Sequence, residues 1–394
     1  MWNKRFGISL ICWLGATVFA VGQQDSLARL KLVFGGDIMG HSPQIEAATI
    51  EKDKLFDYSP CFQFVSPILE QADLAIANLE LTLPGKPPYT GYPTFRSPDE
   101  LALALRRAGF DLLVTSNNHS CDAGLTGVVN TIKTLQNYGF YQTGTFLDST
   151  YRQALYPLIV YKNNFKLAFL NYTYGTNGLP VPKPSVVNLI DTALIQKDLQ
   201  VARQMQPDYV IVILHWGNEY QLNETDAQRN LAQKIFEWGG DLIIGAHPHV
   251  IQPLKEHIYQ RPGESQARKG LVAYSLGNFI SNQRQPNTDM GLMVEVELEK
   301  NWNTNTTRLA AHDYIPIFRY IHRDITTGRV QYYTVPVAAF EPGEALPLAM
   351  PAATIASMKQ TASNMRKHLG RFASQERNVS LGDIQPPVSA PAGN

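Results

Sequence analysis

Residues 209–219, YVIVILHWGNE, carry the pattern that decides the fold: a short, continuous apolar run followed at once by polar side chains. Uninterrupted runs rich in β-branched residues are typical of strands that are buried on both faces. The polar residues begin at His215, where the strand is expected to end. The segment therefore predicts a buried strand that delivers a histidine at its carboxyl end.

The same pattern recurs along the chain and alternates with helical stretches. Six further apolar runs predict strands over residues 30–36, 74–78, 111–116, 166–172, 241–245 and 271–275. Helices are predicted over residues 97–109, 124–138, 191–205 and 224–238. The first has a capping box from Ser97 with Pro98 at the first helical position, and Gly139 and Gly239 follow two others as helix stops. Strands that alternate with helices predict an α/β layered fold, in which helices flank the sheets of a single domain.

The C-terminal part of the chain has a different pattern. Residues 290–340 alternate apolar and polar positions, which predicts antiparallel strands that complete the same domain, with a turn at Thr327-Gly328. Residues 347–371 predict one helix, and the composition from about Ser374 onwards predicts disorder. The expected organisation is a signal peptide (1–22), one large domain (23–345, with its core at 32–282) and a helix with a tail (346–394).

The N-terminus resembles an export signal. Lys4 and Arg5 precede an uncharged apolar run over residues 6–21, and the small residues Ala20 and Gly22 predict cleavage before Gln23. The mature protein is then expected in the periplasm or outside the cell. The alternative is an N-terminal membrane anchor that is retained.

Composition excludes several classes of protein. The 394 residues include 34 Lys and Arg against 34 Asp and Glu, so the chain has no net charge to attract nucleic acid in general. Three cysteines exclude a disulfide framework and a Cys-rich zinc module, so any metal must be held by His, Asp, Glu or Asn. Of the three, Cys12 would leave with the signal peptide. Cys61 and Cys121 either pair or remain thiols, and we slightly favour thiols.

Polar side chains that can bind metals follow six of the predicted strands. They are Asp37, Asn78 with Glu80, Asn117 with Asn118 and His119, His215 with Glu219, His247 with His249, and Asn278. The carboxyl ends of strands in such folds meet at one edge, so these side chains are expected to lie together. Carboxylate, amide and imidazole ligands suit Zn, Mn or Fe. His247 and His249 are expected on the same side of an extended segment.

Simpler roles exist for each of these residues alone. Asp37 is a candidate turn cap after Gly35-Gly36, and Asn118 is a candidate for a local Asx turn. The combination at six strand ends favours a metal site over these separate explanations. The segment at residues 35–40, GGDIMG, lacks the spacing of a nucleotide-binding loop, and the serine-hydrolase motif GxSxG is absent from the sequence.

Several ordered motifs carry a resemblance to a known family. They are GGDIMG (35–40), ADLAIANLE (72–80), FRSP (95–98), AGFDLLVTSNNHSCDAG (108–124), ILHWGNEY (213–220), GAHPHVIQP (245–253) and YSLGNF (274–279). Over about residues 32–282 the sequence resembles the CapA (PgsA-type) poly-γ-glutamate capsule biosynthesis proteins, a branch of the calcineurin-like metallophosphoesterase superfamily. The resemblance implies a layered metallophosphatase-like sandwich and a site with two divalent ions.

The resemblance also implies roles for matching residues. Asp37 and His249 would hold one metal, and Asn118, His215 and His247 the second. Glu80 would stand where the superfamily has a bridging aspartate. His119 would be the general acid. Arg96 matches a family position near the site and is a candidate to bind an anionic substrate, although a solvated arginine fits as well. Asn278, Tyr172 and Tyr174 are weaker candidates.

Two positions depart from the broader superfamily. Met39 stands where its Asp-x-His motif has histidine, and His41 comes two positions too late to replace it. Two functions are therefore expected. The first is an exported metal-dependent hydrolase of an anionic cell-envelope substrate, either a phosphoester or a γ-glutamyl polymer, with capsule-synthesis machinery as a partner. The alternative is a capsule-assembly or polymer-binding protein that keeps the fold without turnover.

Overall fold

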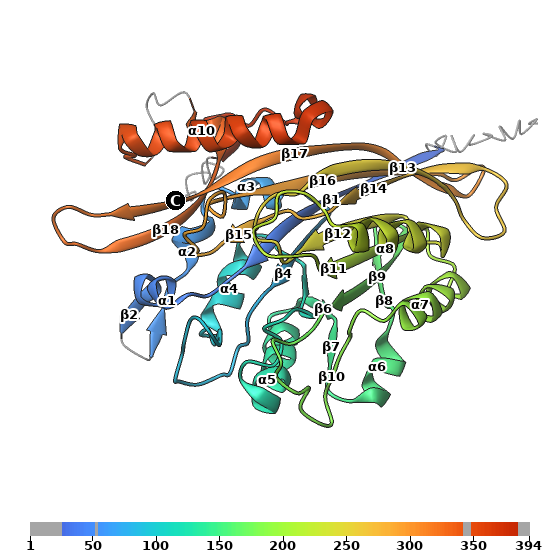
Figure 1. The fold of residues 1–394 in the computed structure, drawn as a ribbon, viewed down its shortest axis with the longest axis horizontal. Helices are drawn as coiled ribbons and strands as arrows, with labels where there is room; N and C mark the ends of the chain where they lie inside the picture. The colour runs from blue at the N-terminus through green and yellow to red at the C-terminus, as the bar shows by residue number, and fades with distance from the viewer. Residues whose placement is uncertain (1–25, 52–53, 342–347, 385–394) are drawn as a thin grey trace, which may run out of the picture.

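The computed structural model describes residues 26–51, 54–341 and 348–384. The predicted signal peptide therefore lies outside the described residues. Two large sheets form the centre of the molecule, and helices cover their outer faces (Figure 1). This architecture confirms the predicted α/β class, with mixed sheets flanked by helices.

The first sheet has eight strands. In spatial order they are β18 (Val330–Pro336), β17 (Thr306–Arg323), β16 (Met290–Asn301), β1 (Leu27–Ile38), β4 (Leu74–Leu79), β5 (Leu112–Val114) and β6 (Tyr141–Thr143), with β15 (Asn278–Ile280) also paired to β1. Strands β1, β4, β5 and β6 are parallel, whereas β16, β17 and β18 join as antiparallel neighbours. The antiparallel strands predicted for residues 290–340 are confirmed, with Gly328 in a left-handed turn at φ 71°.

The second sheet has six strands. Their order is β13 (Leu254–Gln260), β14 (Ala267–Ala273), β12 (Leu242–Ala246), β11 (Tyr209–His215), β9 (Phe165–Thr173) and β8 (Leu158–Lys162). The four central strands are parallel. Two small pairs, β2 (Thr49–Glu51) with β3 (Leu55–Phe56) and β7 (Thr145–Phe146) with β10 (Val186–Val187), lie outside both sheets.

Strand β11 shows why its sequence is continuously apolar. Ile211 and Ile213 point into a large core that also contains side chains of the eight-stranded sheet. Val210, Val212 and Leu214 point into a second core on the opposite face. Because both faces are buried, alternation of apolar and polar residues is absent, as the sequence pattern predicted.

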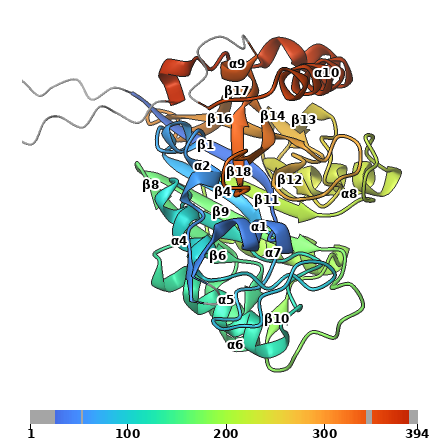
Figure 2. The same cartoon turned by 90° about the vertical axis from the view of Figure 1, so that its left-hand side faces the viewer.

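Helices pack on the outer sides of the sheets. The second core includes apolar side chains of α7 (Thr192–Gln204) and α8 (Asp226–Glu237). The other helices are α1 (Ser42–Ala48), α2 (Ser59–Phe62), α3 (Ser66–Leu69), α4 (Glu100–Arg107), α5 (Gly124–Asn137), α6 (Ser149–Leu155), α9 (Val337–Phe340) and α10 (Ala352–Leu369). Figure 2 shows α10 as a separate layer above β17.

Two local predictions differ from the structure. The capping box at Ser97 is absent: the backbone N–H of Ser97 donates to Thr82, and its hydroxyl has no hydrogen-bond partner. This pairing holds Ser97 outside the helix, so α4 begins at Glu100 without a side-chain cap. Disorder from about Ser374 is also wrong as far as residue 384, since two short 3₁₀ helices, Gly370–Gln375 and Leu381–Ile384, bury Phe372 and Ile384. The tertiary contacts of these apolar residues outweigh the local composition.

A close approach of two chain segments explains the glycine pair before Asp37. A β-carbon at Gly36 would lie 1.9 Å from the carbonyl oxygen of Gly277. The absence of a side chain lets the segment after β14 pair with β1, which brings Asn278 opposite Asp37 in the sheet. The glycines therefore allow two predicted site residues to meet.

Cys61 and Cys121 are both buried, free thiols, which confirms the favoured interpretation. Within the described part of the chain, none of the helices combines the length and the apolar character needed to cross a bilayer.

Candidate metal centre

Five strands from the two sheets bring the predicted ligands together. Their carboxyl ends deliver Asp37 from β1, Glu80 after β4, Asn118 after β5, His215 from β11, and the pair His247 and His249 after β12. All six residues are buried. The site therefore lies where the carboxyl ends of both sheets meet, as expected for the strand ends of an α/β fold.

The ligand atoms form overlapping groups. Asp37, Glu80 and His249 have one candidate ligand atom each within 4.8 Å of one another, and so do Glu80, His215 and His247. Asn118 joins the second group, because its amide oxygen lies 2.8 Å from Nε2 of His215. The two groups correspond to the two metal positions that the family resemblance implies, although a third group, Glu219 with His247 and His249, joins histidines of both. Glu80 belongs to both groups, as a bridging carboxylate would.

Two asparagines orient these ligands from behind. The Asn78 amide donates to Asp37 at 2.8 Å and lies 3.2 Å from Nδ1 of His215. The Asn278 oxygen lies 3.1 Å from Nδ1 of His249. Hydrogen bonds of this kind fix the ring orientation of a ligating histidine and leave its other nitrogen available.

The backbone of residues 247–249 is not the extended segment that the sequence analysis expected. His247 has φ 96° and His249 has φ 59°, in the left-handed region that residues with a β-carbon rarely adopt. The expectation of an extended segment is therefore wrong, although both imidazoles face the cluster, with ring centroids 5.9 Å apart. Backbone strain at such a position is typical of functional sites.

Burial changes the charge of the cluster. It lowers the pKa of His215 to about 3, and it lowers that of His247 to about 2, where the nearby imidazoles add to the effect. Both rings are then neutral at pH 7, which is the form that binds metals. Burial also raises the pKa of Glu80, although the positive charge of His249 opposes the shift. A bound cation would reverse this preference for the protonated acid.

The cluster contains buried polar atoms without partners. Both carboxylate oxygens of Glu80 and Nδ1 of His247 have no hydrogen-bond partner among the residues that the structure describes, and Glu80 is fully buried. Such atoms are costly unless something else satisfies them. Carboxylate, imidazole and amide donors at this spacing fit a divalent cation of the Zn, Mn or Fe kind.

His119 lies beside the cluster in a position suited to proton transfer. Its Nδ1 lies 2.7 Å from the Asp122 carboxylate, which fixes the ring, and its Nε2 lies 3.5 Å from the Asn177 amide. Both His119 and Asp122 line a cavity of about 800 Å³ next to the ligands Asn118 and His249. The ring is therefore oriented with its second nitrogen towards the space that a substrate would enter.

The remaining candidates lie in different places. Arg96 donates through Nε and Nη2 to the Asp122 carbonyl and is not among the residues that line the cavity. Tyr172 is buried in the second core, where its hydroxyl donates to Asp198, so it lies outside the site. Tyr174 stacks over His215, with ring centroids 6.2 Å apart. His41 lines the cavity, but no candidate ligand group of the described residues includes it.

The family resemblance assigned no role to four residues of the site, although two of them, Asn78 and Glu219, are among the strand-end side chains expected to lie together. Glu219 forms a ligand group with His247 and His249, and Asp122, Asn177 and Asn78 support His119 or the ligands. Glu219 and Asn78 follow strands, so the strand-end rule that found the others also points to them. For Asp122, the only signal in the sequence is its position three residues after His119. No pattern in the sequence indicates Asn177.

Solved structures of low similarity include phosphatases. A phosphatase from Mycoplasma pneumoniae is 16% identical with a TM-score of 0.43, and the match covers 74% of this chain and 94% of the other. The calcineurin-like phosphoesterase YfkN from Bacillus subtilis is 13% identical with a TM-score of 0.43, covering 87% and 99%.

Sequence relatives extend over most of the domain. The PGA biosynthesis protein CapA of Bacillus subtilis (strain 168) is 28% identical over 286 residues, 69% of this chain and 68% of the relative. The capsule biosynthesis protein CapA of Bacillus anthracis is 28% identical over 255 residues, which cover 61% of this chain and 58% of the relative. The family described as "Bacterial capsule synthesis protein PGA_cap" matches residues 31–283, a range that includes every residue of the cluster. With more than half of its length in this match, the chain belongs to the PGA_cap family of bacterial capsule synthesis proteins.

Proposed function

We propose that the chain is an exported, metal-dependent hydrolase of the CapA type. Its substrate is an anionic component of the cell envelope, either a phosphoester or a γ-glutamyl polymer. One observation carries the proposal: the carboxylate of Glu80 is fully buried, lacks a hydrogen-bond partner and lies 3.5 Å from His215 and 3.7 Å from His249. A divalent cation would compensate this carboxylate and use as ligands the neutral imidazoles of His215 and His247, and that of His249 once its proton is lost.

Two ions fit the donor set. Asp37 and His249 would hold the first ion. Asn118, His215 and His247 would hold the second ion. Glu80 would be a ligand of both ions. Bound divalent ions would activate water and stabilise negative charge that develops on the substrate. The buried asparagines behind the ligands would keep them in place.

His119 would act as the general acid. Its Nδ1 lies 2.7 Å from the Asp122 carboxylate, so Nε2, which lies 3.5 Å from the cavity residue Asn177, is the nitrogen left for proton transfer. A carboxylate in this position orients the imidazole. A histidine positioned in this way contributes about 10²- to 10⁴-fold to a rate.

The cellular setting of the proposal comes from the family and the N-terminus. The relatives in Bacillus subtilis and Bacillus anthracis are described as PGA and capsule biosynthesis proteins. By the same likeness, we propose that this chain works with capsule-synthesis machinery. The basic and apolar pattern of residues 1–22 supports export to the periplasm or beyond, with a retained anchor as the alternative.

One observation favours a second function. Met39, at the position where the superfamily has a histidine, is 2% exposed, and its thioether is a poor ligand for hard cations. Loss of one ligand weakens the first metal position. A protein that binds the capsule polymer or assists assembly without turnover would follow if the cluster holds too little metal to catalyse hydrolysis.

The test joins metal analysis of the mature protein to a hydrolysis panel of phosphomonoesters, phosphodiesters and γ-glutamyl peptides. We expect one or two divalent ions per chain and turnover of at least one substrate class. His119→Ala should lower turnover about 10²- to 10⁴-fold and leave the metal content unchanged. His368→Ala, on α10 and outside the cluster, is the matched control and should retain full activity.

The outcomes separate the alternatives. If the protein neither contains nor recruits a divalent metal, the hydrolase proposal is wrong. If metal binds and no substrate is turned over, the binding function is favoured. If His119→Ala hydrolyses substrate as fast as the wild type, the general acid is a different group.

A further inference from the structure

The cavity beside the metal cluster has one wall formed by a loop, residues 281–289. The cavity that His119 lines is also lined by four residues of this loop, Asn282, Gln283, Arg284 and Gln285. Arg284 is the only Lys or Arg among its lining residues in the described part of the chain, whereas two acidic residues, Asp122 and Glu219, line it as well. Arg96, the candidate from the sequence, does not line the cavity. Arg284 is therefore the positively charged side chain that an anionic substrate would contact in the cavity.

Arg284 is held in place but has no acidic partner. Its Nη2 donates to the Asn282 side chain at 2.8 Å, and the same oxygen accepts a hydrogen bond from Tyr332 at 2.7 Å. Among the described residues, no carboxylate forms an ion pair with Arg284, and the side chain is exposed. Arg319 lies near it, donates to the Gln283 carbonyl and leaves its Nε without a partner. Among the described residues neither guanidinium group forms an ion pair with a carboxylate, although the charge of Asp289 acts on Arg319.

The surface continues from Arg284 into a second hollow. This hollow has a volume of about 920 Å³ and shares Arg284 with the first cavity. Arg323 and Arg329, from the ends of β17 and β18, also line it, and both are exposed without a carboxylate partner in the described chain. Glu46 and Asp57 line the same hollow, so its charge is mixed, with arginines in the majority.

We propose that Arg284 is a specificity-determining residue that selects substrates with negative charge beyond the reacting group. The bound substrate is an extended chain with repeated carboxylate or phosphate groups, which continues from the metal cluster past Arg284 towards Arg323 and Arg329. This inference rests on the proposed function and deepens it. Guanidinium groups bind both anions through paired N–H donors, and unpaired arginines along a groove favour a chain of charges over a single one.

Binding of labelled oligomers tests the inference directly. The probes are fluorescent γ-linked glutamate oligomers of two to eight residues, uncharged γ-linked glutamine oligomers of equal length, and glycerol phosphate oligomers of equal charge. Fluorescence anisotropy is measured with the full mature chain in a His119→Ala background, so that turnover does not consume the probe. Affinity should rise with length for a charged chain and fall as salt increases.

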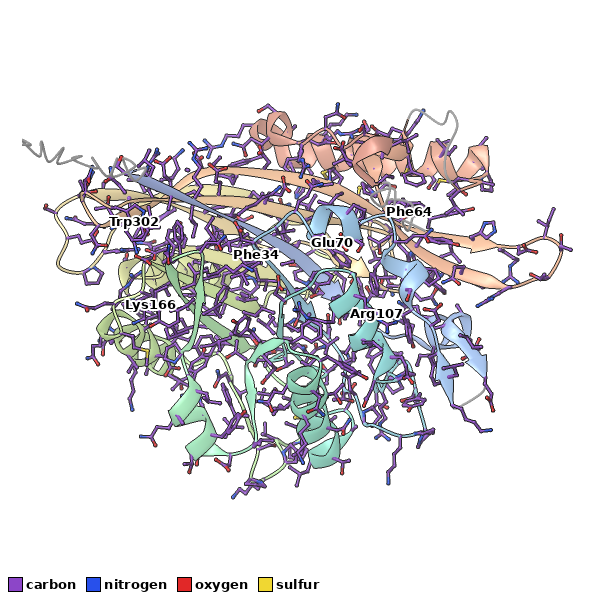
Figure 3. The ribbon with its side chains drawn as sticks, turned by 180° about the vertical axis from the view of Figure 1, so that it is seen from behind. Phe34, Phe64, Glu70, Arg107, Lys166 and Trp302 are labelled. Atoms are coloured by element: carbon purple, nitrogen blue, oxygen red, sulfur yellow. The ribbon has the colours of Figure 1, made fainter. Side chains whose placement is uncertain are left out.

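Arg284→Gln should weaken binding of the longer charged oligomers by about tenfold, the loss of one charged hydrogen-bonded contact. Arg107→Gln is the matched control, because Arg107 is also exposed but lies at the end of α4 (Figure 3), which leads to the amino end of β5, whereas Asn118 of the cluster follows the carboxyl end of that strand. Its binding should equal that of the parent. The comparison of glutamate with glycerol phosphate oligomers identifies the anion that is preferred.

The results distinguish this inference from the proposed function. Equal binding by Arg284→Gln and Arg107→Gln, or equal binding of charged and uncharged oligomers, overturns the role of Arg284. In the catalytically active chain, Arg284→Gln should raise the KM for longer charged substrates more than it raises the KM for a small phosphomonoester. If charged oligomers bind through Arg284 but the active chain hydrolyses none, the hydrolase proposal fails and the role of Arg284 is supported.

Discussion

Two buried carboxylates, Asp241 and Glu80, lie at opposite ends of the strands and have opposite surroundings. Asp241 precedes β12 and accepts hydrogen bonds from Arg203 at 2.6 Å, from Arg261 at 2.7 Å through two nitrogens, and from the backbone of Val210 at 2.7 Å. Glu80 follows β4 and accepts no hydrogen bond from the part of the chain that the structure describes. Both side chains have 0% exposure.

The pKa values of the two groups differ accordingly. Burial alone would raise the pKa of Asp241, but the charges of Arg203 and Arg261 outweigh it and lower the pKa to about 2. For Glu80 burial dominates and raises the pKa. The charge of Asp241 is therefore fully compensated by groups of the protein itself, as in a structural ion network. Glu80 requires a partner from outside, as a metal ligand does.

The largest expected effect is the loss of the Asp241 network. Asp241→Asn removes the charge that neutralises Arg203 and Arg261, which are themselves largely buried. The free energy of unfolding, measured with denaturant at pH 7, should fall by about 3 to 5 kcal/mol, because breaking a buried ion pair leaves uncompensated charge.

The control for this substitution is Asp226→Asn. Asp226 pairs with Arg229 at the surface, with 88% of its side chain exposed, so stability should change by less than about 1 kcal/mol. Equal losses in the two variants would mean that the Asp241 network is not a special source of stability.

The second effect is stabilisation by metal. Addition of Mn²⁺ or Zn²⁺ to chelator-treated wild type should increase the free energy of unfolding by about 2.7 kcal/mol when the free ion is 100 times above its Kd. Glu80→Gln should lose most of this gain, and its metal-free form should be no less stable than the wild type, because the removed carboxylate has no hydrogen-bond partner. Thermal and denaturant unfolding provide the measurement.

Asp241→Asn is the control for this measurement, because it should lower the free energy of unfolding by the same amount with and without metal. A Glu80→Gln protein that gains as much from metal as the wild type would show that Glu80 is not a ligand.

The third effect is a dependence on pH in the acid range. The folded-state pKa of Asp241, about 2, lies below its ordinary value of 3.8. The ionised group therefore contributes its full stabilisation above pH 3.8, and the contribution is lost as the pH falls towards 2. The difference in stability between wild type and Asp241→Asn should shrink by about 2 kcal/mol over this interval. Denaturant unfolding at several pH values between 5 and 2.5 measures it, and a constant difference would contradict the assignment.

The smallest effect concerns the hydrogen bonds behind the cluster. Asn78→Ala removes the donor to Asp37 and the neighbour of His215, and should lower metal affinity roughly tenfold without unfolding the protein. Competition with a chelator measures the affinity. Asn137→Ala, at the exposed end of α5, is the control and should bind metal as the wild type does. Equal affinities would leave Asn78 without a role in positioning.

Much of the fold follows from local sequence patterns. The seven predicted strands and the helices at 124–138, 191–205 and 224–238 appear in the structure within a few residues of their predicted bounds. Continuous apolar runs and helix-stop glycines act over short distances, so the sequence reveals them directly. The six predicted ligands follow from the same kind of pattern, because they lie at the ends of strands, and a strand end is a local feature.

Arrangements that depend on distant segments were not predictable. Arg96 appeared as a substrate contact, but its guanidinium donates to the Asp122 carbonyl, 26 residues away. Arg284 enters the cavity because Asn278 holds its loop through Gln283 and Thr288. The left-handed backbone at His247 and His249 follows from packing around the cluster, and no local preference favours it.

The sequence by itself determined the kinds of ligand, their positions after strands and the layered α/β class, because apolar periodicity and chain order are sufficient for these. The tertiary structure alone decided which buried carboxylate is neutralised. Asp241 receives Arg203 and Arg261 from other parts of the chain. Glu80 receives no hydrogen bond from the described residues: it lies 3.5 Å from the neutral ring of His215 and 3.7 Å from His249, whose positive charge it shares with Asp37. Charge compensation depends on distances between residues that are remote in sequence, and only the folded chain sets those distances.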